Sequence, residues 1–192
     1  MVPIINECLD TLNEADRLRP PTANPIGLYA FSSADPRSVS QRIRLSVQDF
    51  CPSFPLAGLP IYRSERGKPF FADSSLQLSI SHSGHWWVLG LSALPLGIDV
   101  QEKRPARFEA LARRFFHPEE VAFLQQNDFQ EFYRIWTAKE SYVKLTGSGI
   151  DSHFASFSVL RWPERFQTVD LEDGYVLTIC SDGGSNPILK VF

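Results

Sequence analysis

Hydrophobic positions recur along the chain at two spacings, one helical and one extended. Apolar residues every third or fourth position predict helices over four stretches: residues 38–50, 106–116, 117–126 and 129–147. Alternating or continuous short apolar runs predict strands at residues 26–31, 61–71 (two strands about a charged turn), 76–84, 86–93, 96–100, 154–162, 175–181 and 187–192. The strands between residues 61 and 100 follow one another closely, which predicts an antiparallel meander. The order of helices and strands indicates an α+β fold rather than a doubly wound parallel sheet.

Size and charge narrow the class of protein. The chain has 192 residues, 43% of them hydrophobic, which suits one domain or two small lobes sharing a core. It has no apolar run of bilayer length, and its first ten residues do not resemble a secretion signal. Three widely spaced cysteines favour a reducing cytoplasm, and a net charge of -3 argues against a nucleic-acid partner.

Three charged residues stand among apolar neighbours. Asp99 is the last residue but one of the run "PLGIDV", and Glu140 and Lys144 lie on one helix face in "WTAKESYVKL". One interpretation of the helical pair is a surface salt bridge, which contributes little stability. The other is chemical: carboxylates from two separate elements can share one Mg²⁺ ion, and a neighbouring lysine can neutralise phosphate.

Upstream residues could contribute to a phosphate site. The segment "SISHSG" places Ser81 and His82 at a strand end, and "RGKP" places Lys68 in a tight turn. A hydrolase built from Ser81, His82 and Asp99 is disfavoured, because adjacent strand residues face opposite sides and no nucleophile-elbow motif surrounds a serine.

The motifs "RGKP", "ISHSG", "LGIDV", "FFHPEE" and "WTAKESYVK" occur here in one characteristic order. In this the chain resembles the 4'-phosphopantetheinyl transferase superfamily, in particular its long, monomeric, surfactin-synthetase-activating type. The resemblance implies a pseudo-twofold pair of similar α/β lobes, residues 1–100 and 101–192, with the ligand cleft between them. It also implies Mg²⁺-dependent transfer (Mn²⁺ is possible) of phosphopantetheine from coenzyme A to a serine of an apo acyl or peptidyl carrier protein, releasing 3',5'-ADP. No membrane or nucleic acid takes part in such a reaction.

The resemblance assigns roles residue by residue. It makes Asp99 and Glu140 metal ligands, with Glu140 also a candidate base for the serine, and it places Lys144 on the pyrophosphate. Glu120 is the alternative base. Coenzyme A contacts are assigned to Lys68, Ser81 and His82, and to an arginine in "QRIRL", where Arg42 fits the pattern better than Arg44.

One position departs from the family pattern. Many long members carry a metal-binding glutamate two residues after the aspartate, whereas this chain has Gln101. A glutamine carbonyl can bind Mg²⁺, but the site loses one formal charge, so weaker metal binding is expected. A catalytically weak coenzyme A or carrier-protein binding module is therefore the alternative function.

Carrier docking also has a candidate surface. The stretch "KRPARFEALARRFF" concentrates five basic residues: Lys103, Arg104, Arg107, Arg113 and Arg114. They form either a solvated helix face or a docking patch for carrier proteins, which are generally acidic.

Overall fold

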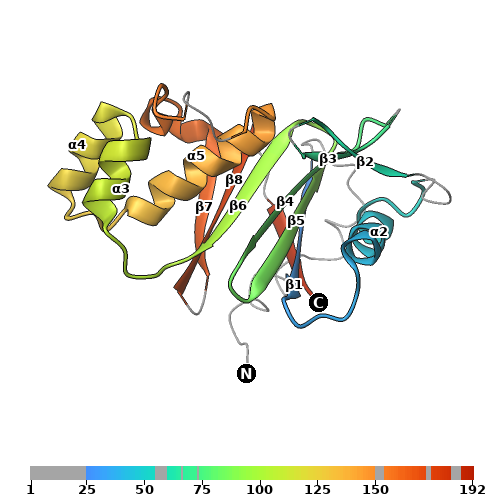
Figure 1. The fold of residues 1–192 in the computed structure, drawn as a ribbon. Helices are drawn as coiled ribbons and strands as arrows, with labels where there is room; N and C mark the ends of the chain where they lie inside the picture. The colour runs from blue at the N-terminus through green and yellow to red at the C-terminus, as the bar shows by residue number, and fades with distance from the viewer. Residues whose placement is uncertain are drawn as a thin grey trace, which may run out of the picture.

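The computed structural model describes residues 25–54, 60–65, 67–72, 74–149, 154–171, 174–182 and 187–192. Within these residues it is a mixed α+β structure with four α-helices (Figure 1). No helix in this part of the chain is long and apolar enough to cross a membrane. The predicted α+β class is therefore confirmed.

The first sheet has the strand order β4-β5-β1-β9. It consists of β4 (Gln77–Ser83), β5 (Trp86–Ser92), β1 (Ile26–Ser32) and β9 (Pro187–Val191). Strands β4, β5 and β1 are antiparallel neighbours, whereas the C-terminal β9 pairs in parallel with β1. Residues near the two ends of the chain thus share one sheet.

Helix α2 (Val39–Phe50) lies against this first sheet (Figure 1). Its N-terminus is fixed by a capping box, in which the Ser38 hydroxyl accepts from the Gln41 N–H and the Gln41 side chain accepts from the Ser38 N–H. Ile43 and Val47 are buried in the core of this sheet with Phe31 and Leu89. The predicted helix over 38–50 is confirmed.

The second sheet has the order β6-β8-β7, and its three strands are antiparallel. They are β6 (Leu96–Glu102), β8 (Tyr175–Ser181) and β7 (Phe166–Leu171). The prediction of one continuous meander is wrong at two points: the hairpin over residues 61–71 forms a separate two-stranded sheet, and β6 pairs with β8 rather than with β5. Strand β8 lies about 80 residues further along the chain, and nothing in the hydrophobic pattern of residues 61–100 predicts that β6 pairs with it.

Helix α5 (Phe132–Thr146) packs on β6 and β8 of the second sheet. Gly147 ends the helix in the left-handed conformation that favours glycine, as predicted. The helix starts three residues later than predicted, because Asp128 and Phe129 have positive φ angles that a helix does not allow.

Two shorter helices, α3 (Phe108–Phe115) and α4 (Pro118–Gln126), stand beside α5 (Figure 1). Both were predicted, including Pro118 in the first turn of α4. The predicted strand over 154–162 is wrong: the segment turns and forms the 3₁₀ helix η2 (Val159–Arg161), followed by η3 (Pro163–Arg165). Its buried residues Phe154 and Val159 pack with α3, α4 and α5 instead of alternating across a sheet.

The remaining pair, β2 (Ile61–Arg63) and β3 (Pro69–Phe71), forms the predicted hairpin about the "RGKP" turn. Residue 66 of that turn lies outside the described residues.

Gly97 allows α5 to approach β6 closely. A Cβ atom added at Gly97 would lie 1.8 Å from the backbone oxygen of Ser141 and 2.5 Å from the backbone nitrogen of Leu145. Both atoms belong to the helix backbone, so no side-chain rotation can relieve the overlap. The glycine before Ile98 and Asp99 therefore sets the distance between the strand that carries Asp99 and the helix that carries Glu140.

We predict that Gly97→Ala lowers the free energy of unfolding by more than about 3 kcal/mol, because α5 must move away from β6. Urea denaturation followed by circular dichroism measures the change. The control is Gly174→Ala, whose added Cβ meets no atom within 4 Å and whose φ of +78 costs only about 1 to 2 kcal/mol. Equal losses for the two variants would contradict the close-packing argument.

Candidate functional site

A cleft of about 510 Å³ brings together residues from the first sheet, from the β2–β3 hairpin and from α5. The β2–β3 hairpin contributes Lys68, β4 contributes His82, and α5 contributes Glu140 and Lys144. These four residues were singled out from separate sequence motifs, and the fold places them around one space. Lys68 and Lys144 are basic and His82 supplies an imidazole, and this combination suits an anionic ligand.

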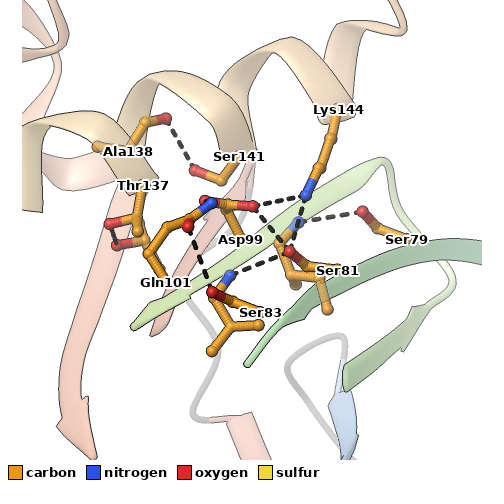
Figure 2. Close-up of polar contacts among 12 residues, drawn as sticks. Ser79, Ser81, Ser83, Asp99, Gln101, Thr137, Ala138, Ser141 and Lys144 are labelled. Carbon is orange, nitrogen blue, oxygen red and sulfur yellow. Dashed lines mark hydrogen bonds and ion pairs between the residues drawn. The ribbon is translucent and has the colours of Figure 1, made fainter. Parts of the chain in front are cut away.

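Asp99 on β6 is the centre of the polar contacts beside this cleft (Figure 2). Its side chain is 2% exposed and forms an ion pair with Lys144, whose Nζ lies 2.6 Å from Asp99 Oδ1. The Ser81 hydroxyl also donates to Oδ1 at 2.7 Å, and the Gln101 amide donates to Oδ2 at 3.2 Å. A buried carboxylate needs such partners, because an unpaired buried charge is costly.

Glu140 is the second buried carboxylate of the site, on α5 one turn before Lys144. Burial, and secondarily the negative charge of Asp99, raise the pKa of Glu140 to about 7, while Lys144 acts in the opposite direction. Because the charges of Asp99 and Lys144 both affect the pKa of Glu140, the three side chains lie close enough to interact electrostatically. Glu140 is therefore poised to bind or release a proton near neutral pH.

Lys68 and His82 face the same cleft from the side of the first sheet. Lys68 Nζ donates to the backbone oxygen of Leu145 at 3.1 Å, which ties the hairpin to the end of α5. Burial lowers the pKa of Lys68. His82 is exposed, whereas the adjacent Ser81 is buried, so the two side chains lie on opposite faces of β4, as expected for neighbours on a strand.

The two arginines of α2 are placed differently. Arg42 is buried, with its guanidinium 5.8 Å from the Phe31 ring centroid and 5.5 Å from that of Trp87. Its Nη2 donates to the backbone oxygen of Asp35 at 2.7 Å. Arg42 thus fixes the segment before α2 and does not line the cleft, and Arg44, half-buried, does not line it either.

Glu120 lies in a separate buried cluster, away from the cleft lining. It forms a fully buried ion pair with Lys139 at 2.9 Å. Its Oε1 also accepts from the Val159 N–H at 2.8 Å, and its Oε2 accepts from the His117 N–H at 2.9 Å. Both oxygens are occupied in joining α4, α5 and η2, so the arrangement does not bring Glu120 to Asp99 and Glu140.

The donor set around Asp99 suits a hard divalent cation. No group of three or more histidine, cysteine, aspartate or glutamate side chains among the described residues could hold a metal ion. Asp99 and Glu140 nevertheless place two buried carboxylates near one lysine, and the pKa of Glu140 is raised by burial first and by the negative charge of Asp99 second. Gln101 turns its amide nitrogen toward Asp99, while its carbonyl oxygen accepts from Ser83 at 3.4 Å.

The sequence analysis missed Arg63, which lines the cleft beside Lys68. Its Nη1 donates to the backbone oxygen of Gly67 at 3.0 Å, so it braces the turn that carries Lys68. The side chains of Trp87 and Val39 form an apolar part of the lining of the same cleft. The only sequence signal for Arg63 is its proximity to the "RGKP" motif.

The raised pKa of Glu140 predicts a pH dependence of stability in metal-free protein. A rise from 4.5 to about 7 means that the folded state holds the proton more tightly than the unfolded state. The stability from this group is therefore complete below pH 4.5 and is lost as the pH rises through about 7, by about 3 kcal/mol.

Urea unfolding of wild type and Glu140→Gln, in EDTA from pH 4.5 to 8.5, isolates this contribution. The difference in unfolding free energy between the two proteins should grow with pH in favour of the glutamine variant. A difference that stays constant across this range would contradict the buried, coupled state of Glu140.

Comparison with known proteins gives a consistent result. Residues 95–184 match the model of the 4'-phosphopantetheinyl transferase superfamily. The chain is 36% identical to a 4'-phosphopantetheinyl transferase of Bacillus subtilis, with 62% of this chain and 55% of that protein covered. It is 34% identical to 4'-phosphopantetheinyl transferase psf-1 of Bacillus pumilus (63% and 60% covered) and 32% identical to 4'-phosphopantetheinyl transferase Sfp of Bacillus subtilis strain 168 (61% and 60% covered).

The matched regions span between about half and two thirds of the length of these relatives. The family match contains Asp99, Gln101, Glu140 and Lys144, the residues that the fold gathers beside the cleft. On these grounds the chain is similar to the 4'-phosphopantetheinyl transferase superfamily over residues 95–184.

Proposed function

We propose that this protein transfers the 4'-phosphopantetheine arm of coenzyme A to a serine of an apo acyl or peptidyl carrier protein and releases 3',5'-ADP. The observation that carries the proposal is the cleft that joins Lys68, His82, Glu140 and Lys144 next to buried Asp99. Two lysines and an imidazole around one space suit a ligand that carries several phosphates. Glu140, in the same lining, suits proton removal from an incoming hydroxyl.

The transfer replaces one phosphorus–oxygen bond by another. The carrier serine oxygen bonds to the β-phosphorus of coenzyme A, and the bond from that phosphorus to the bridging oxygen breaks, so 3',5'-ADP leaves with the electron pair. Lys144 stabilises the negative charge of the pyrophosphate, since two of its ammonium hydrogens are held by Asp99 and Ser81 and one remains for the ligand. Positioning and charge stabilisation supply most of the catalysis in such reactions.

We assign the base to Glu140 rather than to Glu120. Glu140 lines the cleft one turn before Lys144, and one of its carboxylate oxygens can accept the serine proton while the other holds a divalent cation. Both oxygens of Glu120 are already engaged within a fully buried ion pair. Glu120 therefore supports the helices around the site.

Asp99 and Glu140 would hold a Mg²⁺ or Mn²⁺ ion, and Gln101 would support it through Asp99. When bound, the ion supplies positive charge at the pyrophosphate. The remaining features are proposals too: a pseudo-twofold pair of similar α/β lobes, a monomeric state and a cytoplasmic location. The division at residues 100 and 101 stays a prediction.

A mass-spectrometric assay tests the function. Wild-type protein, coenzyme A, Mg²⁺ and an apo carrier should give a carrier whose mass increases by one phosphopantetheine. Asp99→Asn and Glu140→Gln should each reduce turnover by at least about a hundredfold, because charge stabilisation or proton removal is lost.

Circular dichroism provides the control that both variants remain folded. Near-wild-type turnover in either variant would contradict the assigned roles. Coenzyme A binding by wild type with no mass gain on any of a panel of apo carriers would instead indicate the alternative, a binding module.

Docking of the carrier is proposed at α3. The structure leaves the basic stretch exposed but partly paired: Lys103 contacts Asp170 at 2.7 Å, and Arg113 contacts Glu109 at 2.8 Å. Arg107 and Arg113 line a shallow groove together with Phe108, which offers apolar and basic surface in one place. This mixture suits an acidic partner with an apolar contact face.

Reversal of charge at this surface tests the docking proposal. Arg113→Glu combined with Arg114→Glu should raise the KM for carrier at least about fivefold and leave the KM for coenzyme A unchanged. Lys190→Glu, which reverses an exposed charge on β9, is the control and should change neither constant. An unchanged carrier KM in the double variant would place the docking surface elsewhere.

A further inference from the structure

A short connection, residues 103–107, carries the chain from β6 to α3 and passes next to the start of α5 (Figure 1). It forms neither helix nor strand, and all its residues are exposed. Within the part of the chain that the structure describes, the backbone hydrogen bonds that tie it to elements other than α3 are those of Lys103 and Arg104. Arg107, the residue before α3, provides no side-chain cap for that helix. The position of the connection therefore depends on few contacts.

One side chain of α5, Tyr133, makes most of these contacts. Its hydroxyl accepts from the Arg104 N–H at 2.9 Å and donates to the Arg104 carbonyl oxygen at 2.8 Å. A phenol has one proton to donate and lone pairs to accept, so both bonds can exist together. The other contact is the Lys103 N–H, which donates to the Gly174 oxygen at 2.7 Å. Tyr133 thus holds both backbone polar groups of one residue and fixes the orientation of that segment.

The Tyr133 ring extends the same anchor to α3. Its centroid lies 5.8 Å from that of Phe108, in an edge-to-face arrangement. Phe108 is the first residue of α3 and lines the shallow groove together with Arg107 and Arg113. Arg107 is exposed and forms no ion pair among the described residues. A single tyrosine therefore contacts both the backbone of the basic connection and the apolar residue of the groove.

Tyr133 also belongs to the helix that carries the reacting groups. Glu140 follows it on α5 by two turns, which is about 10 Å along the helix axis. The groove at α3 and the glutamate in the cleft are thus both referred to one helix. Tyr133 does not itself line the cleft, so a change at its hydroxyl affects the connection without removing a contact from the cleft.

We propose that Tyr133 is a positioning residue for the carrier protein. It holds the basic connection and Phe108 in a fixed place relative to Glu140, so that a docked carrier presents its serine to the cleft. This inference rests on the proposed transfer reaction and on carrier docking at α3. The partner is a protein surface of acidic and apolar residues, which matches Arg107 and Phe108.

The energetics follow from the exposure of the connection. Without the Tyr133 hydroxyl, the Arg104 N–H and carbonyl can hydrogen-bond to water, so the fold persists. The connection then samples more positions, and a carrier that binds to it must order it again. Ordering a mobile segment on binding weakens affinity.

Comparison of Tyr133→Phe with Tyr142→Phe tests this proposal, since each removes one phenol hydroxyl from α5. Tyr142 stacks on Phe157 and Trp162, and its hydroxyl forms no hydrogen bond within the described residues. We expect the KM for an apo carrier to rise about fivefold in Tyr133→Phe and to stay within about twofold of wild type in Tyr142→Phe. In both variants kcat and the KM for coenzyme A should stay within about twofold of wild type, because neither side chain lines the cleft.

Two further measurements do not require the reaction. Hydrogen–deuterium exchange at the Arg104 amide should be at least about threefold faster in Tyr133→Phe, because its acceptor is lost, and unchanged in Tyr142→Phe. The Kd for an apo carrier without coenzyme A, measured by fluorescence anisotropy, should rise about fivefold in Tyr133→Phe alone.

An unchanged carrier KM in a folded Tyr133→Phe would overturn the proposal, even if its melting temperature fell, because the tyrosine would then only stabilise the fold. An equal rise of KM in Tyr142→Phe, or unchanged exchange at the Arg104 amide, would overturn it as well. Absence of transfer by wild-type protein would refute the proposed function itself, and the carrier Kd would still decide whether Tyr133 positions a binding surface. Wild-type protein that neither modifies nor binds an apo carrier would refute both.

Discussion

The ion pair between Asp99 and Lys144 is the interaction on which the site depends. It joins a strand of the second sheet to α5 at 2.6 Å, and Ser81 extends the connection to the first sheet. A buried carboxylate survives in the folded state only when such partners compensate its lost hydration. The close packing at Gly97 makes the pair possible, because it brings the backbone of α5 directly onto β6.

A second buried pair organises the surroundings of the first. Lys139 and Glu120 are both fully buried, and the Lys139 ammonium lies 3.9 Å from the Phe157 ring centroid. Lys139 and Glu140 are adjacent on α5 but point in different directions. Lys139 points to Glu120 among the helices, whereas Glu140 lines the cleft. The Lys139–Glu120 pair holds α4 and η2 in place. Glu140, by contrast, has burial and a like charge as its main influences, which leaves its pKa near neutrality.

Much of the site could be predicted from the sequence, because its motifs are local. Asp99 follows Gly97 on a short strand, and Glu140 and Lys144 repeat at helical spacing. The placements of Arg42 and Glu120 could not be predicted: both are charged residues in plausible motifs, yet long-range packing against aromatic rings or a buried lysine decides where they lie. The pairing of β6 with β8, and the conversion of 154–162 into turns and η2, likewise depend on contacts distant in sequence. The alternating serines of β4 are typical of the polar face of a strand. Only the position of β6, which is distant in the local pattern, makes them acceptors for its backbone N–H groups.

A crystal structure of the protein with coenzyme A and Mg²⁺ tests the central claim most directly. The account predicts that the diphosphate lies in the cleft within hydrogen-bonding distance of the Lys144 ammonium, with Asp99 and Glu140 both directed at the same cation. A diphosphate located elsewhere, or carboxylates of Asp99 and Glu140 that point into different regions, would contradict it.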